Sequence, residues 1–314
     1  MNKKIIILLS LLVVAFTIFY FVYVHNKSND NGSKNALATS EIDTITYEDE
    51  EVDFSNYNEI NVDLDNEKEV YNITTGGVYH FTGSINGYIK VNTKDDVKII
   101  LDNVTITNDN GPVIYGVNSK NIYIEIIGEN TLTDGKTYSN FDEEVTALIF
   151  SNDDLIFSGT GTLNINANYN DAISSDDDIL FVNGTYNIKS KDDGIRGKDS
   201  VVIESGIFNI EASGDGIKST NDTEDEKGYI LIKNGTFTIN SNNDGIQGIN
   251  VEIDSGDFNI KTTNTSDSAK GIKADKNILI KKGNITINSV DDGIHSNDVL
   301  QIDNGTIIIN SKSN

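Results

Sequence analysis

Apolar and polar residues alternate in short runs through the second half of the chain. In a typical unit, Ile179 and Phe181 precede Gly184, and Tyr186 and Ile188 follow it. Alternation with a period of two predicts half-buried β-strands, and apolar positions at helical spacing are nowhere sustained. The pattern therefore predicts an all-β fold.

A short turn, in most copies Asp-Gly-Ile, sets the period of these units. Successive copies start 22, 22, 29, 26 and 22 residues apart, at Asp171, Asp193, Asp215, Asp244, Lys270 and Asp292. The first copy is the looser Asp171-Ala172-Ile173. A period of this size is typical of a solenoid, in which each unit buries its apolar face only against its neighbours.

The strands are expected to be parallel. Asn-Gly pairs between apolar runs would by themselves favour β-hairpins, but equivalent residues recurring once per unit favour rungs stacked on one another, with glycines such as Gly184 at the bends between sheets. We expect a right-handed parallel β-helix, a single-stranded solenoid of about 22 residues per coil, its hand following from strand twist. A leucine-rich repeat, the alternative solenoid, would need a Leu-rich strand that the unit lacks.

Weaker copies of the unit extend upstream. Asn110-Gly111 and Thr146-Ala147-Leu148 occupy the place of the turn, and the coils are expected to begin near Val62. About ten coils would fit, so we expect residues 55–314 to form one β-helix domain with no visible cap on its last rung.

The N-terminal segment predicts a location. Lys3 and Lys4 precede an uncharged apolar run over residues 5–24, which is long enough to span a bilayer. We expect residues 1–24 to be a membrane anchor with its N-terminus in the cytoplasm, residues 25–54 to be a flexible linker, and the domain to lie outside the cell. A cleaved signal peptide, giving a secreted protein, is the alternative.

Composition narrows the partners. Lys and Arg number 24 against 49 Asp and Glu, a net charge of -25, which argues against nucleic acid and favours cations. The chain has no Cys and three His, so a zinc cluster is not expected. We expect a monomer.

The turns bring acidic residues into a column. Equivalent positions of successive coils lie about 4.8 Å apart, and like charges at that distance repel. Calcium would relieve such a column, because it accepts six to eight oxygen ligands; the alternative is that Asp before Gly is simply favourable turn chemistry. The candidate calcium ligands are Asp171, Asp192, Asp193, Asp215, Asp244, Asp291 and Asp292. Lys270 would interrupt the column and neutralise its neighbours.

A second column, two positions beyond the glycine of each turn, is expected to point outward beside the acids. Its candidate ligand-binding residues are Arg196, Lys218, Gln247, Lys273 and His295. Bound calcium beside Arg and Lys would suit an acidic polysaccharide. The alternative is that these cations only balance the aspartates in weak surface pairs. An outward apolar row, including Leu180, Val202 and Leu231, would be covered by an insertion or would receive a sugar or protein.

The repeated Asp-Gly-Ile turns, and strands of the type Gly235 to Asn240, resemble the family of calcium-binding, carbohydrate-binding β-helix domains. That family is similar in fold to pectate lyases and is associated with acidic plant-wall sugars and cellulose. The resemblance covers roughly residues 55–314. It implies calcium at the aspartates of the turns from Asp192 onward, whereas Asn110 and Thr146 depart from the motif.

The expected function is a calcium-dependent, noncatalytic polysaccharide binder at the cell surface. A polysaccharide lyase of the pectate type is the first alternative, with Arg196 or Lys218 as the base. A cation beside aspartates has a raised pKa, which argues against that role. A structural adhesin or spacer is the second alternative.

Overall fold

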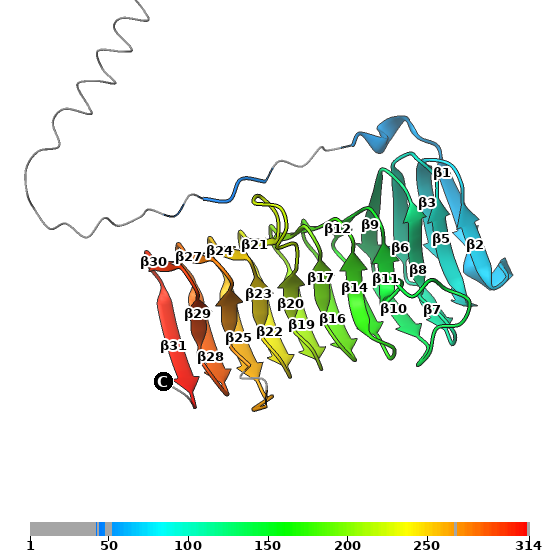
Figure 1. Cartoon of the computed structure of the whole chain (residues 1–314). Coiled ribbons are helices and arrows are strands. Elements are labelled where there is room, and N and C mark those ends of the chain that lie inside the picture. Colours follow the sequence, from blue (N-terminus) through cyan, green and yellow to red (C-terminus); the bar gives the residue numbers. More distant parts are fainter. Residues whose placement is uncertain (1–41, 43, 48–51, 267–268, 313–314) are drawn as a thin grey trace, which may run out of the picture. The chain divides into compact units, whose positions relative to one another are not determined.

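Parallel strands stack rung over rung along the chain, as Figure 1 shows. The computed structural model describes residues 42, 44–47, 52–266 and 269–312. Within them the strands form three sheets of 11, 10 and 10 strands, every pair of neighbours being parallel. The solenoid has about 11 turns of about 23 residues, close to the expected ten coils of 22. The right-handed sense stays a prediction.

The three sheets share a simple order, because each coil gives one strand to each sheet in turn. Sheet A contains β1 (Glu59–Asp63), β3 (Gly77–Thr82), β6 (Val97–Asp102), β9 (Asn121–Ile127), β12 (Asp154–Gly159), β15 (Asp178–Phe181), β18 (Ser200–Ile203), β21 (Tyr229–Ile232), β24 (Asn250–Ile253), β27 (Asn277–Ile280) and β30 (Val299–Ile302). Sheet B contains β2 (Val70–Ile73), β5 (Tyr88–Asn92), β8 (Ile114–Asn118), β11 (Ala147–Ser151), β14 (Asp171–Ser175), β17 (Ile195–Gly197), β20 (Ile217–Ser219), β23 (Ile246–Gly248), β26 (Ile272–Ala274) and β29 (Ile294–Ser296). Sheet C contains β4 (Ser84–Asn86), β7 (Thr105–Asn108), β10 (Glu129–Asp134), β13 (Thr162–Asn166), β16 (Thr185–Ser190), β19 (Ile207–Ala212), β22 (Thr236–Ser241), β25 (Asp257–Thr262), β28 (Asn284–Ser289) and β31 (Thr306–Ser311). Two short 3₁₀ turns, η1 (Phe54–Asn56) and η2 (Leu64–Asn66), flank β1.

The segment expected to be only a turn opens a strand. In most later coils the isoleucine of Asp-Gly-Ile begins a three-residue strand of sheet B, for example β17. Its backbone is held by the next rung, because the N–H of Ile195 donates to the carbonyl of Gly216 at 3.1 Å. The coil therefore has three sides, two of them predicted from the apolar pairs. Gly184, between sheets A and C, has a φ of 127°, as expected of a glycine bend.

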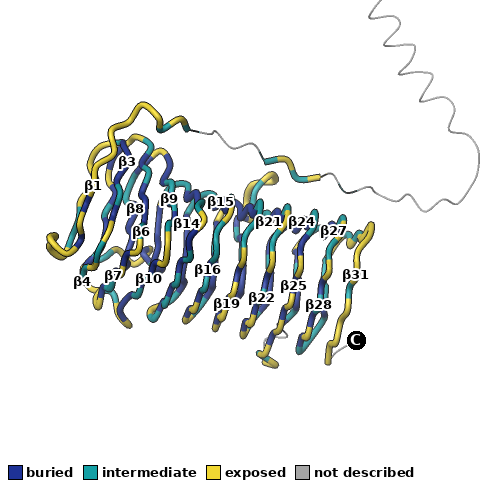
Figure 2. Tube along the Cα trace, turned by 180° about the vertical axis from the view of Figure 1, so that it is seen from behind, coloured by how far each residue is buried: buried dark blue, intermediate teal, exposed yellow. Residues whose placement is uncertain are grey.

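The inward pairs predicted from the alternation form one continuous core. Ile179, Phe181, Tyr186 and Ile188 are all at most 1 % exposed, and Figure 2 shows buried positions recurring on every rung between the ends. Rings on successive rungs stack: the centroids of Phe208 and Phe237 lie 5.0 Å apart, with 6° between their planes. Burial of this column is the main source of stability in the later coils.

The last rung departs from this pattern. Leu300, Ile302 and Ile309 occupy inward positions of β30 and β31 but are 44 %, 45 % and 42 % exposed. They are exposed because β30 and β31 are the last described strands of sheets A and C, so no described strand packs beyond them; Figure 2 shows this rung as largely exposed.

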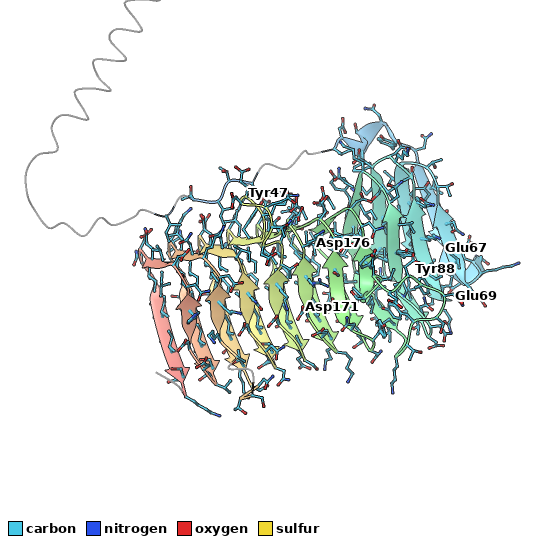
Figure 3. All side chains as sticks on the ribbon, in the orientation of Figure 1. Tyr47, Glu67, Glu69, Tyr88, Asp171 and Asp176 are labelled. Carbon is cyan, nitrogen blue, oxygen red and sulfur yellow. The ribbon has the colours of Figure 1, made fainter. Side chains whose placement is uncertain are left out.

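The outward apolar row of sheet A is covered. Leu180, Val202 and Leu231 are at most 2 % exposed, and Ile45 and Tyr47 pack against them; Figure 3 labels Tyr47 at this edge. The segment is also fixed by polar contacts, since the N–H of Ile45 donates to the carboxylate of Glu252 at 2.6 Å. That buried carboxylate pairs with Lys281 at 2.6 Å. The cover is thus the segment before the first strand, which the sequence did not suggest.

The predicted membrane segment, residues 5–24, lies outside the described residues, as does most of the predicted linker. Among the residues that the structure describes, no helix is both long and apolar enough to cross a bilayer.

Candidate functional site

The aspartates of the turns form a hydrogen-bonded column, here called the aspartate ladder (Asp171, Asp193, Asp215 and Asp244). Each carboxylate accepts the backbone N–H of the equivalent residue on the next rung: Asp171 from Asp193 at 3.0 Å, Asp193 from Asp215 at 2.7 Å, and Asp215 from Asp244 at 2.7 Å. All four side chains are buried, and Figure 3 labels Asp171 at the start of the ladder. One oxygen of each carboxylate therefore has a structural role, which links adjacent rungs and differs from the bond within the turn that the turn-chemistry alternative expects.

The neighbouring outward residues of sheet B, here called the cation column (Arg196, Lys218, Gln247, Lys273 and His295), lie in register. They face the second oxygens of the aspartates. Lys218 Nζ lies 2.6 Å from Asp215 Oδ2 and 3.3 Å from Asp193 Oδ2. Arg196 lies 3.7 Å from Asp171. The predicted placement of the two columns side by side is confirmed.

The remaining members of the cation column continue this pairing. Lys273 Nζ lies 3.6 Å from Asp244 Oδ2. The amide of Gln247, in the orientation that satisfies both neighbours, donates to Asp215 at 3.1 Å and accepts from Lys273 at 3.1 Å. His295 Nδ1 lies 3.0 Å from Asp292 Oδ2. The side chains of Arg196, Lys218, Lys273 and His295 nevertheless stay 26–38 % exposed, so the column can still meet a ligand.

Two carboxyls of the ladder have raised pKa values, chiefly because they are buried. Burial raises the pKa of Asp171 to about 6, against the opposing effects of the Asp193 N–H and Arg196. Burial, reinforced by Asp215, raises the pKa of Asp193 to about 7, although Lys218 lowers it. These two carboxyls are therefore the places in the ladder where a further cation would be most stabilising.

The candidate calcium ligands do not all converge. Asp171, Asp192 and Asp193 offer oxygen atoms that lie within 4.8 Å of one another. Asp215 and Asp244 lie outside this group. Near the C-terminal end, Lys270 Nζ pairs with Asp291 at 2.8 Å, and the backbone N–H of Lys270 donates to Asp244 at 2.7 Å.

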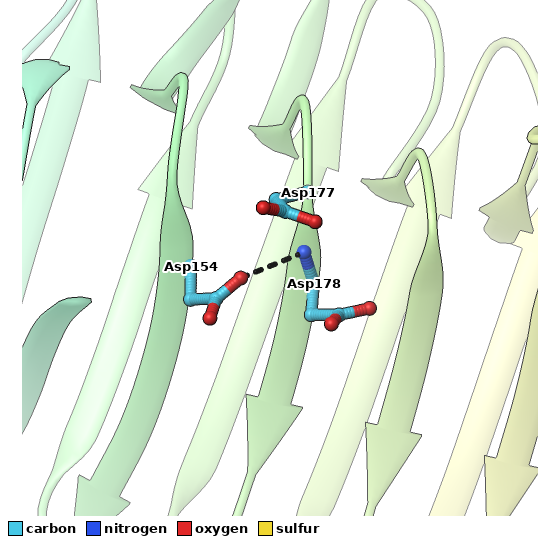
Figure 4. A group of neighbouring side chains, drawn as sticks. All are labelled: Asp154, Asp177 and Asp178. Carbon is cyan, nitrogen blue, oxygen red and sulfur yellow. Dashed lines mark hydrogen bonds between the residues drawn. The ribbon is translucent and has the colours of Figure 1, made fainter. Parts of the chain in front are cut away.

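A second acidic group lies at the corner between sheets B and A, where no metal ligands were expected. Asp154, Asp177 and Asp178 bring oxygen atoms within 4.8 Å of one another. Figure 4 shows the three side chains, with the N–H of Asp178 donating to Asp154 at 3.1 Å. The run of acids at 176–178 was the available signal, but it is also what a solvated corner would show.

Burial also raises the pKa values in this corner group. It raises the pKa of Asp154 to about 6, with Asp178 and Asp153 adding to the effect. Burial and the adjacent Asp199 raise the pKa of Asp177 to about 7. The unfolded chain releases these protons near pH 3.8, so the folded state binds more protons between about pH 4 and 7. Stability then falls as the pH rises through that range.

This gives a testable pH dependence. In chelator, the thermal midpoint is expected to fall between pH 5 and pH 8, and Asp177→Asn is expected to make the fall smaller, because the amide does not titrate. Unfolding curves at a series of pH values check this, with the exposed Asp257→Asn on β25 as a control for lost surface charge. An equal fall in wild type and Asp177→Asn would contradict the role given to this carboxyl.

The fold and site define a β-solenoid with a ladder of acids and cations along one sheet. The family model for the carbohydrate-binding domain-containing proteins matches residues 67–314. The chain therefore belongs to this carbohydrate-binding domain family. A protein of that description from Acetivibrio thermocellus is 31 % identical over 173 residues, which are 51 % of this chain and 59 % of that protein. The matched region thus spans less than two thirds of that relative.

A solved structure is similar as well. The chain resembles the polysaccharide lyase-like protein from C. thermocellum, solved as a gadolinium derivative, with a TM-score of 0.65 and 27 % sequence identity. The similarity covers 79 % of this chain and 98 % of that one. Both comparisons support the resemblance drawn from the Asp-Gly-Ile turns.

Proposed function

We propose that this protein is a noncatalytic, calcium-dependent polysaccharide binder that holds acidic, polyuronate-like glycans along sheet B. Family membership supports carbohydrate as the ligand class. The observation that carries the acidic preference is the convergence of Asp171, Asp192 and Asp193 beside the partly exposed guanidinium of Arg196. A metal ion and a fixed cation would then face the same ligand.

The residues fit calcium by their donor chemistry. The group of Asp171, Asp192 and Asp193 offers only carboxylate oxygens, the donors that calcium prefers, and two of the three have raised pKa values. The corner group at Asp154, Asp177 and Asp178 has the same chemistry and is a second place for an ion. When bound, calcium would supply a bridge between protein and glycan carboxylates.

The cation column would position the polymer. Arg196 has a planar guanidinium that binds a carboxylate through two hydrogen bonds, and Lys218 and Lys273 follow it along sheet B. Because the column repeats at about 4.8 Å per rung, an extended anionic chain would meet several cations in sequence. Each pair contributes little by itself, so binding depends on their number.

Lyase activity is the second candidate, favoured by the description of the similar solved structure. It would need a base to remove a proton beside the uronate carboxyl. Lys218 is poorly suited: burial lowers its pKa, but Asp193 and Asp215 outweigh burial and raise that pKa above its usual value. The ammonium therefore stays protonated, which supports the noncatalytic proposal.

The proposal includes a location. Residues 5–24 would anchor the protein in the membrane and present the solenoid outside the cell, as a monomer that does not bind nucleic acid. The alternative is secretion after cleavage of the N-terminal segment. Fractionation of cells, with detection of the solenoid in membranes or in medium, distinguishes the two.

The test of function measures retention on polygalacturonate in calcium and in chelator, together with the absorbance of unsaturated products. Retention in calcium, lost in chelator and without product, is expected. Arg196→Ala should weaken retention about tenfold, because a charge-assisted bidentate contact contributes about 1.5 kcal/mol or more. Lys189→Ala, which removes a cation from sheet C, is the matched control. Formation of unsaturated product would establish lyase activity. If neither retention nor product is detected, the structural spacer would be the remaining alternative.

A further inference from the structure

The outer face of sheet C carries a second long surface, different in chemistry from sheet B. Outward side chains of β13, β16, β19 and β22 line a shallow groove of about 370 Å³. The register aligns one row of this groove across the four strands, consisting of Asn164, Asn187, Asn209 and Thr238. These residues form the amide row.

Hydrogen bonds along the row fix the orientation of its side chains. Asn187 donates through Nδ2 to Asn164 Oδ1 at 2.8 Å, and Asn209 donates through Nδ2 to Asn187 Oδ1 at 2.9 Å. Asn164 in turn donates to the carbonyl of Asn130 at 3.2 Å. An amide has two N–H groups and two acceptor lone pairs, so Asn187 keeps one donor and one acceptor for a ligand. The rungs repeat this donor and acceptor arrangement at about 4.8 Å.

The groove is uncharged along this row, although the chain carries a net charge of -25. Its one cation and one anion, Lys189 and Glu211, lie on the neighbouring row and pair with each other at 3.0 Å. A polyanion would find no unbalanced cation among the residues that line the groove. The acidic residues that could hold calcium lie at the corners between sheets C and B and between sheets B and A, and not on the face of sheet C. Hydroxyl groups, each a donor and an acceptor, match the free amide groups.

We propose that the amide row is a second glycan-binding surface, which takes an uncharged, extended stretch of polysaccharide through its hydroxyls and without calcium. The inference rests on the proposed function for its ligand class, but it uses a different sheet and different chemistry. Acidic and neutral stretches of glycan would be held on two sides of the solenoid.

The test titrates the full chain, in chelator, with uncharged hexasaccharides of β-linked xylose, mannose and glucose, by calorimetry. The wild type is expected to bind at least one of them. Asn187→Ala combined with Asn209→Ala should weaken that binding about tenfold, the equivalent of one to two lost hydrogen bonds. Asn259→Ala is the matched control, because Asn259 holds the same position on β25, in register with Thr238, outside the lining of the groove.

The outcomes separate this proposal from the proposed function. Loss of hexasaccharide binding, with calcium-dependent retention on polygalacturonate unchanged, would support it. It is overturned if the wild type binds none of the sugars, if the double variant binds as well as wild type, or if a folded double variant also loses retention. A concentration-dependent dimer that the double variant abolishes would show a second copy on this face and would overturn it too. Failure of the wild type to be retained on polygalacturonate in calcium would count against the proposed function, whatever the hexasaccharide result.

Discussion

Phe237→Ala is expected to lower the free energy of unfolding by about 3–5 kcal/mol, the usual loss for a buried ring. Phe237 is 1 % exposed and stacks between Phe208 and Phe258, at centroid distances of 5.0 Å and 4.6 Å. Alanine would leave a cavity at the centre of this column, and the neighbouring rungs cannot close it because their own backbones are paired on both sides.

The measurement should be local as well as global, since solenoids can open a few rungs at a time. Native-state hydrogen exchange is expected to show the amides of β19, β22 and β25 losing protection, with those of β5 unchanged. Phe237→Leu is the control and should cost about 1.5 kcal/mol or less, since Ile285 holds the equivalent inward position on β28. Equal effects of alanine and leucine would contradict the cavity as the cause of the loss.

The repeat period made most of the fold predictable, because it shows which residues hold equivalent positions on successive rungs. The alternation predicts the inward pairs of sheets A and C, and the spacing of the turns predicts the register of Asp193 over Asp171. The strand that each coil gives to sheet B was not predicted, because a strand such as β17 has three residues, too few for alternation to be visible. The cover over sheet A also escaped prediction, because Ile45 and Tyr47 lie outside the repeat.

The site was predictable only in part, for a related reason. Register places side chains of one column next to each other, so the ladder and the cation column could be anticipated. It does not say which oxygen of Asp193 accepts a backbone N–H and which faces Lys218. The corner group was missed although register brings two of its members together: Asp154 and Asp178 directly precede Leu155 and Ile179, which pair across adjacent rungs. These acids lie outside the Asp-Gly-Ile turn from which the acidic column was predicted.

Asp193→Asn is expected to remove most of the stabilisation that calcium provides, while keeping the ladder intact. The amide oxygen of the substituted side chain still accepts the N–H of Asp215, a 2.7 Å bond in the wild type, but the charge that calcium requires is gone. Wild type at a calcium concentration about one hundred times its Kd would gain about 2.7 kcal/mol. Unfolding curves in calcium and in chelator measure this gain for both proteins.

In chelator, where no calcium is bound, Asp193→Asn is expected to change the stability in the opposite direction. The pKa of Asp193 is raised to about 7, by burial and then by Asp215, so at pH 8 the folded wild type holds a buried charge at a cost. Asp193→Asn removes that cost, and Lys218 keeps Asp215 as its partner at 2.6 Å. The variant should therefore be at least as stable as wild type at pH 8. Its advantage should shrink as the pH falls toward 4, where the wild-type carboxyl carries its proton.

The control for this comparison is Asp215→Asn on the next rung. Asp215 has the same structural role, since it accepts the N–H of Asp244 at 2.7 Å. It does not belong to the group in which Asp171, Asp192 and Asp193 converge, so its effect should be equal in calcium and in chelator. Asp193→Ala is less informative, because it leaves the Asp215 N–H without its acceptor and should cost about 1–3 kcal/mol in both conditions. If Asp193→Asn still gains stability from calcium, the ion does not bind at this part of the ladder. The corner group at Asp154, Asp177 and Asp178 would then be its proposed site.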